Sequence, residues 1–226
     1  MTRAADRAIG RCLSDCRPVE PLLEALWIGR RLGIPRFDPR PTEADPDQPA
    51  TILTAVLRLP DDVTGDLRRL TSTLERVDPD HHYYAPNAMH ITLMDASAVA
   101  SRETEAVEVV RTIGSSLRGA SVEIVGLGLT PRSVFAAVRP GNSLRAARRQ
   151  LSREWSGGGR LVDRLRARIW HVNLVRIRIE PSAGLIDEVR ALRHLDRASR
   201  ITALELVRTN KVMAPARTRT LVRVDL

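Results

Sequence analysis

The chain has 226 residues, of which 43% are hydrophobic and 28% are charged, and its formal net charge is +9 at pH 7. This length and composition exclude a disordered chain and indicate one large domain, or two small lobes, with a hydrophobic core. No apolar stretch reaches 18 residues, which excludes a membrane-spanning helix. Residues 1–20 lack the apolar core of a secretion signal, so we expect a cytoplasmic protein.

The positive charge comes almost entirely from arginine, because Lys211 is the only lysine. An anionic partner such as phosphate or nucleic acid would account for this charge. A general arginine bias would account for it equally well, since the arginines are scattered along the chain. Cys12 and Cys16 are too few for a metal quartet or a disulfide scaffold, and we interpret them as free thiols.

Residues 1–48 predict a helical extension and a proline-rich linker, followed by a folded domain over residues 49–226. Apolar residues recur in the extension with the spacing of one helix face: Val19, Leu22, Leu23, Leu26 and Trp27. We favour packing of this helix on the main body over binding of a partner. Five prolines between residues 35 and 49 favour an extended chain there.

The folded domain alternates between strands and helices. Its hydrophobic periodicity predicts strands at 51–59, 88–94, 121–129, 133–138, 168–179, 203–209 and 218–224, and helices at 61–77, 103–117, 143–155 and 181–192. The segment 78–86 is polar and predicts a loop. The unit of strand, helix, histidine-bearing strand, helix and strand therefore occurs twice, with the two copies abutting in the middle, which indicates an internal duplication.

Two of the predicted strands carry the same polar pattern, which is a histidine, one apolar residue and a small polar residue. Alternate residues of a strand point to one face, so His90 shares a face with Thr92, and His171 shares a face with Asn173. One such strand falls in each half of the duplication. We expect the two strands to lie side by side and to direct both histidines into one cleft.

Two histidines beside one scissile bond can divide the work of acid–base catalysis. An imidazole with a pKa near ~6.5 can be neutral or charged at cellular pH, so one ring can accept a proton while the other donates one. The Thr92 hydroxyl and the Asn173 amide can donate hydrogen bonds to phosphoryl oxygens. No carboxylate cluster adjoins the histidines, so we predict no metal and no cofactor; a metal hydrolase would need His81 or His82 as a third ligand.

These residues resemble the motifs of the 2H phosphoesterase superfamily, in particular its bacterial RNA 2′,3′-cyclic phosphodiesterases, also called 2′-5′ RNA ligases. His90-Ile91-Thr92-Leu93 matches the first motif. His171-Val172-Asn173-Leu174-Val175-Arg176 matches the second, with Asn173 where threonine or serine is usual. The resemblance covers about residues 51–226. It implies an α+β (α/β) fold with two lobes related by a pseudo-twofold axis, in which two antiparallel sheets flank a central cleft and the helices lie outside.

The resemblance also implies a function, which is hydrolysis of 2′,3′-cyclic phosphates or 2′-5′-linked RNA or nucleotides, usually without a metal. The catalytic residues would be His90, His171, Thr92 and Asn173. Asn173 leaves open a second interpretation, a non-catalytic module that binds RNA or nucleotides. We favour a hydrolase with altered substrate preference, acting as a monomer.

Four further residues are candidates for substrate binding. Tyr83 and Tyr84 precede the first histidine strand and could stack on a base or anchor their loop. Arg132 and Arg176 could each bind a phosphate. Arg176 has the opposite strand parity to His171, so it should point away from the site unless a β-bulge intervenes, and we rank it below Arg132.

Overall fold

The computed structural model describes residues 45–155, 170–192 and 195–226. The predicted N-terminal helix, both cysteines, most of the proline-rich linker and the first residues of the second histidine strand lie outside the described residues. The described end of the linker contacts the folded domain, because Nδ2 of Asn210 donates to the carbonyls of Pro46 at 2.8 Å and Gln48 at 3.2 Å.

The elements follow the predicted order closely. The strands are β1 (Ile52–Arg58), β2 (His82–Tyr83), β3 (Ile91–Asp95), β4 (Ser121–Thr130), β5 (Ser133–Pro140), β6 (His171–Arg176), β7 (Arg197–Arg200), β8 (Ala203–Thr209) and β9 (Arg219–Asp225). The helices are α3 (Asp61–Val77), α4 (Glu103–Ser115), α5 (Asn142–Trp155) and α7 (Ala183–Ala191), with short 3₁₀ turns η2 (Pro86–Ala88), η3 (Ser97–Arg102) and η4 (Pro215–Arg217).

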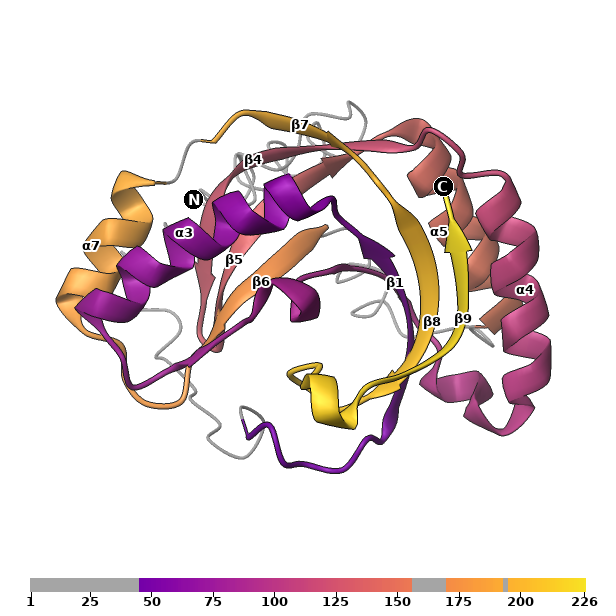
Figure 1. The fold of residues 1–226 in the computed structure, drawn as a ribbon, viewed down its shortest axis with the longest axis horizontal. Coiled ribbons are helices and arrows are strands. Elements are labelled where there is room, and N and C mark those ends of the chain that lie inside the picture. The colour runs from indigo at the N-terminus through magenta and orange to yellow at the C-terminus, as the bar shows by residue number, and fades with distance from the viewer. Residues whose placement is uncertain (1–44, 156–169, 193–194) are drawn as a thin grey trace, which may run out of the picture.

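The strands pair antiparallel in the order β7-β4-β5-β6-β3-β1-β8-β9, and β2 adds to β6 (Figure 1). This order is symmetric about the junction of β3 and β6, the two histidine strands. They pair at one position, where Ile91 lies opposite Val172. The sheet therefore consists of two antiparallel halves joined at their centre, which confirms the predicted α+β fold with two lobes.

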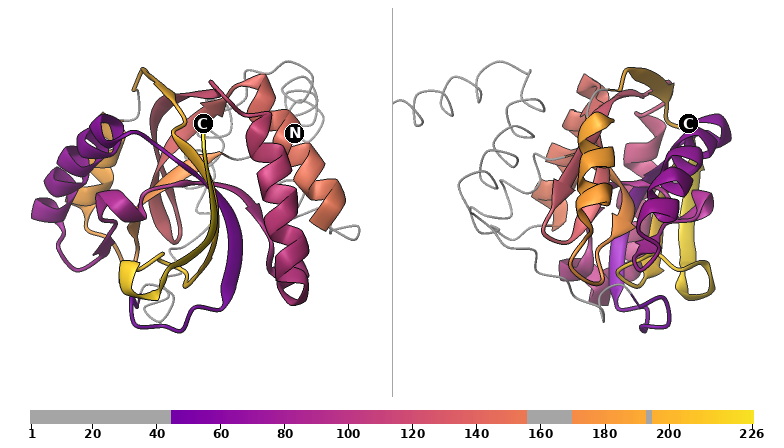
Figure 2. Two further views of the ribbon diagram at one scale, coloured as in Figure 1. Left: turned by 45° about the vertical axis from the view of Figure 1, so that its right-hand side comes forward. Right: turned by 90° about the vertical axis from the view of Figure 1, so that its left-hand side faces the viewer.

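The helices divide between the two halves of the sheet. Helices α3 and α7 contact each other and reach β6 and β4, whereas α5 contacts β3 and α4 contacts β8 and β9 (Figures 1 and 2). Each helix buries the apolar stripe that its sequence predicts; in α5 the stripe is Leu144, Ala147, Leu151 and Trp155. Within the described ranges, no helix combines the length and apolar character needed to cross a membrane.

Two short strands, β2 and β7, were not predicted. Strand β2 lies in the polar segment after α3 and pairs with β6. Strand β7 has the sequence Arg-Ala-Ser-Arg and pairs with β4. Both attach through backbone hydrogen bonds and bury few side chains, so no alternation of apolar residues marks them in the sequence.

A β-bulge follows the small polar residue of each histidine motif. In β3 the pairing with β1 shifts by one residue after Thr92, so that Leu93 has no partner. In β6 the pairing with β5 shifts by one residue after Asn173, so that Leu174 has none. A bulge inserts one residue into a strand and re-aims the side chains that follow it. The duplication thus extends from the motifs to the irregularities beside them.

Candidate active site

The pairing of β3 with β6 brings the four motif residues into one patch. Continuing the register of Ile91 and Val172 by one residue in each direction places His90 opposite Asn173 and Thr92 opposite His171. In an antiparallel pair, directly opposed Cβ atoms lie about 4.5–5.5 Å apart and diagonal neighbours about 7–8 Å apart. The two histidines are therefore diagonal neighbours, each beside the polar residue of the other motif.

This patch is accessible from one side only. Ile91 and Val172 are fully buried behind it, whereas Thr92, His171 and Asn173 are partly exposed. His90 is the most enclosed of the four, with 7% of its surface exposed. We call the surface formed by His90, Thr92, His171, Asn173 and Arg176 the junction face.

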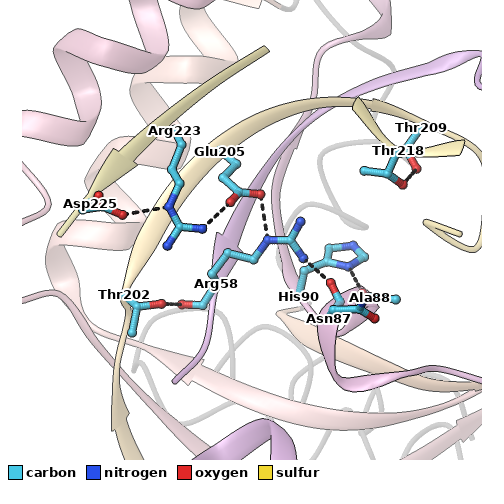
Figure 3. Close-up of polar contacts among 10 residues, drawn as sticks. All are labelled: Arg58, Asn87, Ala88, His90, Thr202, Glu205, Thr209, Thr218, Arg223 and Asp225. Atoms are coloured by element: carbon cyan, nitrogen blue, oxygen red, sulfur yellow. Dashed lines mark hydrogen bonds and ion pairs between the residues drawn. The ribbon is translucent and has the colours of Figure 1, made fainter. Parts of the chain in front are cut away.

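His90 is held in one orientation by the turn that precedes it. Its Nδ1 lies 2.8 Å from the carbonyl oxygen of Ala88, the last residue of η2 (Figure 3). A carbonyl only accepts, so Nδ1 carries the hydrogen, and Nε2 of the neutral ring is left as a proton acceptor. The hydrogen bond thereby selects one tautomer.

The environment of His90 also disfavours its charged form. Burial is the main cause, and the Arg58, His171 and Arg176 charges act in the same direction, so that the pKa of His90 falls to about 4. The hydrogen bond to Ala88 opposes this shift but does not overcome it. His90 is therefore neutral at pH 7 in the unliganded protein.

His171 has a different environment at the start of β6. Its ring packs edge-on against Phe135, with the centroids 5.5 Å apart and the planes at 68°. Phe135 lies opposite Asn173 on the neighbouring strand β5. An edge-to-face contact of this kind orients a ring without using its nitrogens as hydrogen-bonding groups.

Arg176 lies on the junction face, contrary to the prediction from strand parity. Because of the bulge at Leu174, the consecutive residues Leu174 and Val175 are both buried. The next residue, Arg176, therefore lies on the partly exposed side of β6. Its charge acts on His90, and its guanidinium also hydrogen-bonds the buried Tyr84 hydroxyl. The Nε of Arg176 is buried and has no hydrogen-bond partner among the described residues. A buried donor of this kind is costly unless a ligand satisfies it.

Both tyrosines make structural contacts, and burial excludes Tyr84 from the stacking role considered from sequence. Tyr84 is 1% exposed and its hydroxyl approaches the carbonyl of Lys211 at 3.5 Å, so neither face of its ring is open to a base. The Tyr83 hydroxyl donates to carbonyls at the end of α3, Leu74 and Asp78. Both residues anchor the segment that leads into the first motif.

Arg132 lies in the turn between β4 and β5, beside the end of β6. Its backbone carbonyl accepts a hydrogen bond from the amide of Ile177 at 2.9 Å. Arg176 is opposite Ser133 in the register, next to this turn. The bulge therefore removes the reason for ranking Arg176 below Arg132, and both stay candidates for a phosphate contact.

Arg148 is a component of the site that sequence reasoning missed. It extends from α5 behind the junction face, where its Nε donates to the Leu93 carbonyl at 2.9 Å and its Nη2 donates to the Thr92 carbonyl at 2.6 Å. Its guanidinium carbon lies 3.4 Å from the ring centroid of Trp170, the residue before His171. Arg148 is 9% exposed, and burial lowers its pKa to about 9. One side chain thus supports both motifs. The available signal was its position within the apolar stripe of α5.

His81 and His82 come from the segment between α3 and η2, outside the two histidine motifs. His81 is buried near Asp78, with Nε2 and Oδ2 separated by 3.3 Å. His82 lies opposite Arg176 in the pairing of β2 with β6, and its ring meets Tyr84 edge-on. Across the part of the chain that the structure describes, no three histidine, cysteine or acidic side chains are grouped to hold a metal ion.

No family model matches the sequence, and no curated protein matches it. Solved structures do match. TT0787 of Thermus thermophilus gives a TM-score of 0.56 at 20% identity, covering 77% of this chain and 97% of that one. E. coli LigT gives 0.52 in its complex with 3′-AMP and 0.51 in its complex with NADP+, each at 15% identity over 78% of this chain and 98% of LigT. The chain therefore has the same fold as TT0787 and E. coli LigT, which is the fold that the resemblance of the two motifs implies.

Proposed function

We propose that this protein is a metal-independent phosphodiesterase that hydrolyses 2′,3′-cyclic phosphates or 2′-5′-linked RNA or nucleotides. The observation that carries the proposal is the register of β3 and β6, which makes His90 and His171 diagonal neighbours on one accessible face. Beside them, the buried Nε of Arg176 is a donor that has no partner among the described residues. This arrangement suits a monoanionic phosphodiester bound between two imidazoles.

The reaction needs one proton acceptor and one proton donor. The neutral histidine takes the proton of the attacking water as the water oxygen bonds to phosphorus. The bond from phosphorus to a ribose oxygen breaks, and the protonated histidine gives its proton to that oxygen. In a 2′-5′ linkage a ribose hydroxyl can replace water as the attacking group. Thr92, Asn173 and Arg176 donate hydrogen bonds to the phosphoryl oxygens, on which negative charge develops.

The structural neighbours support a nucleotide or RNA substrate. E. coli LigT has been crystallised with 3′-AMP and with NADP+, both of which contain a ribose and a phosphate. The net charge of +9 suits an anionic substrate as well.

The proposal is tested by assaying the purified full chain against 2′,3′-cyclic mononucleotides and 2′-5′-linked dinucleotides, with 3′-5′-linked dinucleotides as the control. We expect turnover of at least one of the first two classes, undiminished by EDTA, with a bell-shaped dependence of kcat/KM on pH because one ring must be neutral and the other charged. No turnover of either class, or activity that EDTA abolishes and added metal restores, would reject the proposal.

Asn173 distinguishes the enzyme from a binding module with the same fold. The Asn173 side chain is partly exposed on the junction face opposite His90, where its amide can donate to a phosphoryl oxygen. We therefore expect the parent chain to be active already, and Asn173→Thr to change its relative kcat/KM values for different substrates. If the natural chain is inactive and Asn173→Thr hydrolyses a cyclic phosphate, the chain is a binding module whose second motif has lost catalysis. Asn173→Ala is the matched control, because it removes the donor in either case.

A further inference from the structure

The two histidines of the junction face differ in the residue beside them on the outer strand. In the pairing of β1 with β3, Leu57 lies opposite Ile91, so the next position places Arg58 beside His90. In the pairing of β5 with β6, Ala137 lies opposite His171. The duplication is therefore broken at this position. An arginine accompanies the first histidine, and an alanine accompanies the second.

Arg58 is fixed at both ends of its guanidinium. Its Nε donates to Oε2 of Glu205 on β8 at 2.8 Å, and its Nη1 donates to the carbonyl of Asn87 at 2.9 Å (Figure 3). Its own backbone carbonyl accepts from the amide and the hydroxyl of Thr202. Asn87 belongs to η2, and the next carbonyl in that turn, of Ala88, accepts the Nδ1 hydrogen of His90. Arg58 thus holds the turn that selects the tautomer of His90.

Glu205 secures Arg58 from the opposite side. Glu205 is only 4% exposed, and its second oxygen accepts from Nη1 of Arg223 at 2.8 Å. Arg223 in turn contacts Asp225 near the surface (Figure 3). A buried carboxylate shared by two arginines keeps both in fixed positions. The Arg58 charge therefore lies at a constant place beside His90.

We propose that Arg58, held by Glu205, is a positioning residue that fixes His90 in its Nδ1–H tautomer and adds to the effect of burial in keeping the ring neutral, which makes His90 the proton acceptor and leaves His171 as the donor. The assignment of roles rests on the function proposed above, whereas the state of the ring does not. The charged groups that face His90 are Arg58 from β1 and His171 and Arg176 from β6, with Glu205 behind Arg58 on β8. Of these, Arg58 alone also holds the turn that contains Ala88.

The test is a pH titration of the His90 ring by NMR, in the full chain, with the signal assigned by its loss in His90→Gln. The chain has five histidines, so the spectrum is simple. Removing the Arg58 charge removes a repulsion of the proton, so Arg58→Gln should raise the pKa of His90 by about one unit and reduce the Nδ1–H population. Glu205→Gln removes the negative charge that offsets the charge of Arg58. It should therefore lower the pKa of His90.

The opposite signs separate positioning from general loosening, because water entering a loosened site would raise the pKa of His90 in both variants. Arg208→Gln is the matched control; it removes a β8 arginine that pairs with Glu103 on α4, and it should leave the His90 titration unchanged. An unchanged pKa in folded Arg58→Gln, or equal shifts in both variants, would overturn the proposal. Should Arg58→Gln fail to fold, Glu205→Gln decides, since an unchanged or raised pKa in that variant contradicts the proposal.

Kinetics provide the second arm. Because the acceptor must be neutral, the acidic limb of kcat/KM should move to higher pH in Arg58→Gln, and the alkaline limb should not move. A shift of the alkaline limb alone would instead make His90 the donor and overturn the assignment. Absence of turnover in the unmodified chain would reject the proposed function, while the NMR titration would still decide the state of His90.

Discussion

Replacing either histidine of the junction face by alanine is expected to lower kcat about 10²–10⁴-fold while the protein stays folded. In the proposed reaction each imidazole moves one proton in the transition state, so its loss should affect kcat more than substrate binding. The two rings act as a pair, so the double variant His90→Ala/His171→Ala should lose little more than the more damaged single variant. Steady-state kinetics on a 2′,3′-cyclic nucleotide measure all three.

Folding and chemistry must be separated in this experiment. His171 is partly exposed, so His171→Ala should leave the circular dichroism and the thermal unfolding midpoint close to those of the parent chain. His90→Ala removes a buried ring and its hydrogen bond to Ala88, so its midpoint should fall while its circular dichroism stays that of a folded chain. His90→Gln is a second control, because it keeps a polar side chain of similar size without an imidazole. A folded alanine variant with the parent kcat would show that the ring is not catalytic.

Arg176→Gln is expected to lower kcat/KM about 10²–10³-fold, the typical loss when one donor to a developing oxyanion is removed. The kcat/KM of Arg176→Lys should lie between the values of the parent chain and of Arg176→Gln, because lysine keeps the charge but loses the planar arrangement of donors. Arg178→Gln is the matched control; it removes an exposed arginine two residues further along the chain and should change kcat/KM little.

The stability of the Arg176 variants sharpens this prediction. The Nε of Arg176 is buried without a partner among the described residues, so Arg176→Gln removes an unsatisfied donor. The variant also loses the hydrogen bond to the Tyr84 hydroxyl, so we expect the thermal midpoint to change little while activity falls. A residue kept for packing would show the reverse. Equal activity in Arg176→Gln and Arg178→Gln would exclude Arg176 from the phosphate site.

Local patterns in the sequence were sufficient to predict most elements and which residues of the candidate site share a face within one strand. Helix α3 begins and ends where the acidic first turn and the apolar period of its sequence predict. The shared face of His90 with Thr92, and of His171 with Asn173, follows from the alternation of side chains within one strand. These features are predictable because each depends on residues that are close together in the chain.

The rest of the site depends on which strands pair and in what register. Arg176 reaches the junction face because β6 bulges against β5, and a bulge is a relation between two strands that neither sequence displays alone. Tyr84 becomes unavailable because residues far along the chain cover it, and Arg148 supports both motifs because α5 packs behind β3.

The sequence by itself determined the α+β class, the two histidine motifs and the residues that share a face within each, since all of these arise from local periodicity. Tertiary structure alone decided that the motifs meet diagonally, that Arg176 joins them, and that Arg58 accompanies only the first histidine. The physical reason is that strand register is selected by burial and backbone pairing across the whole sheet, between segments that are remote in the chain.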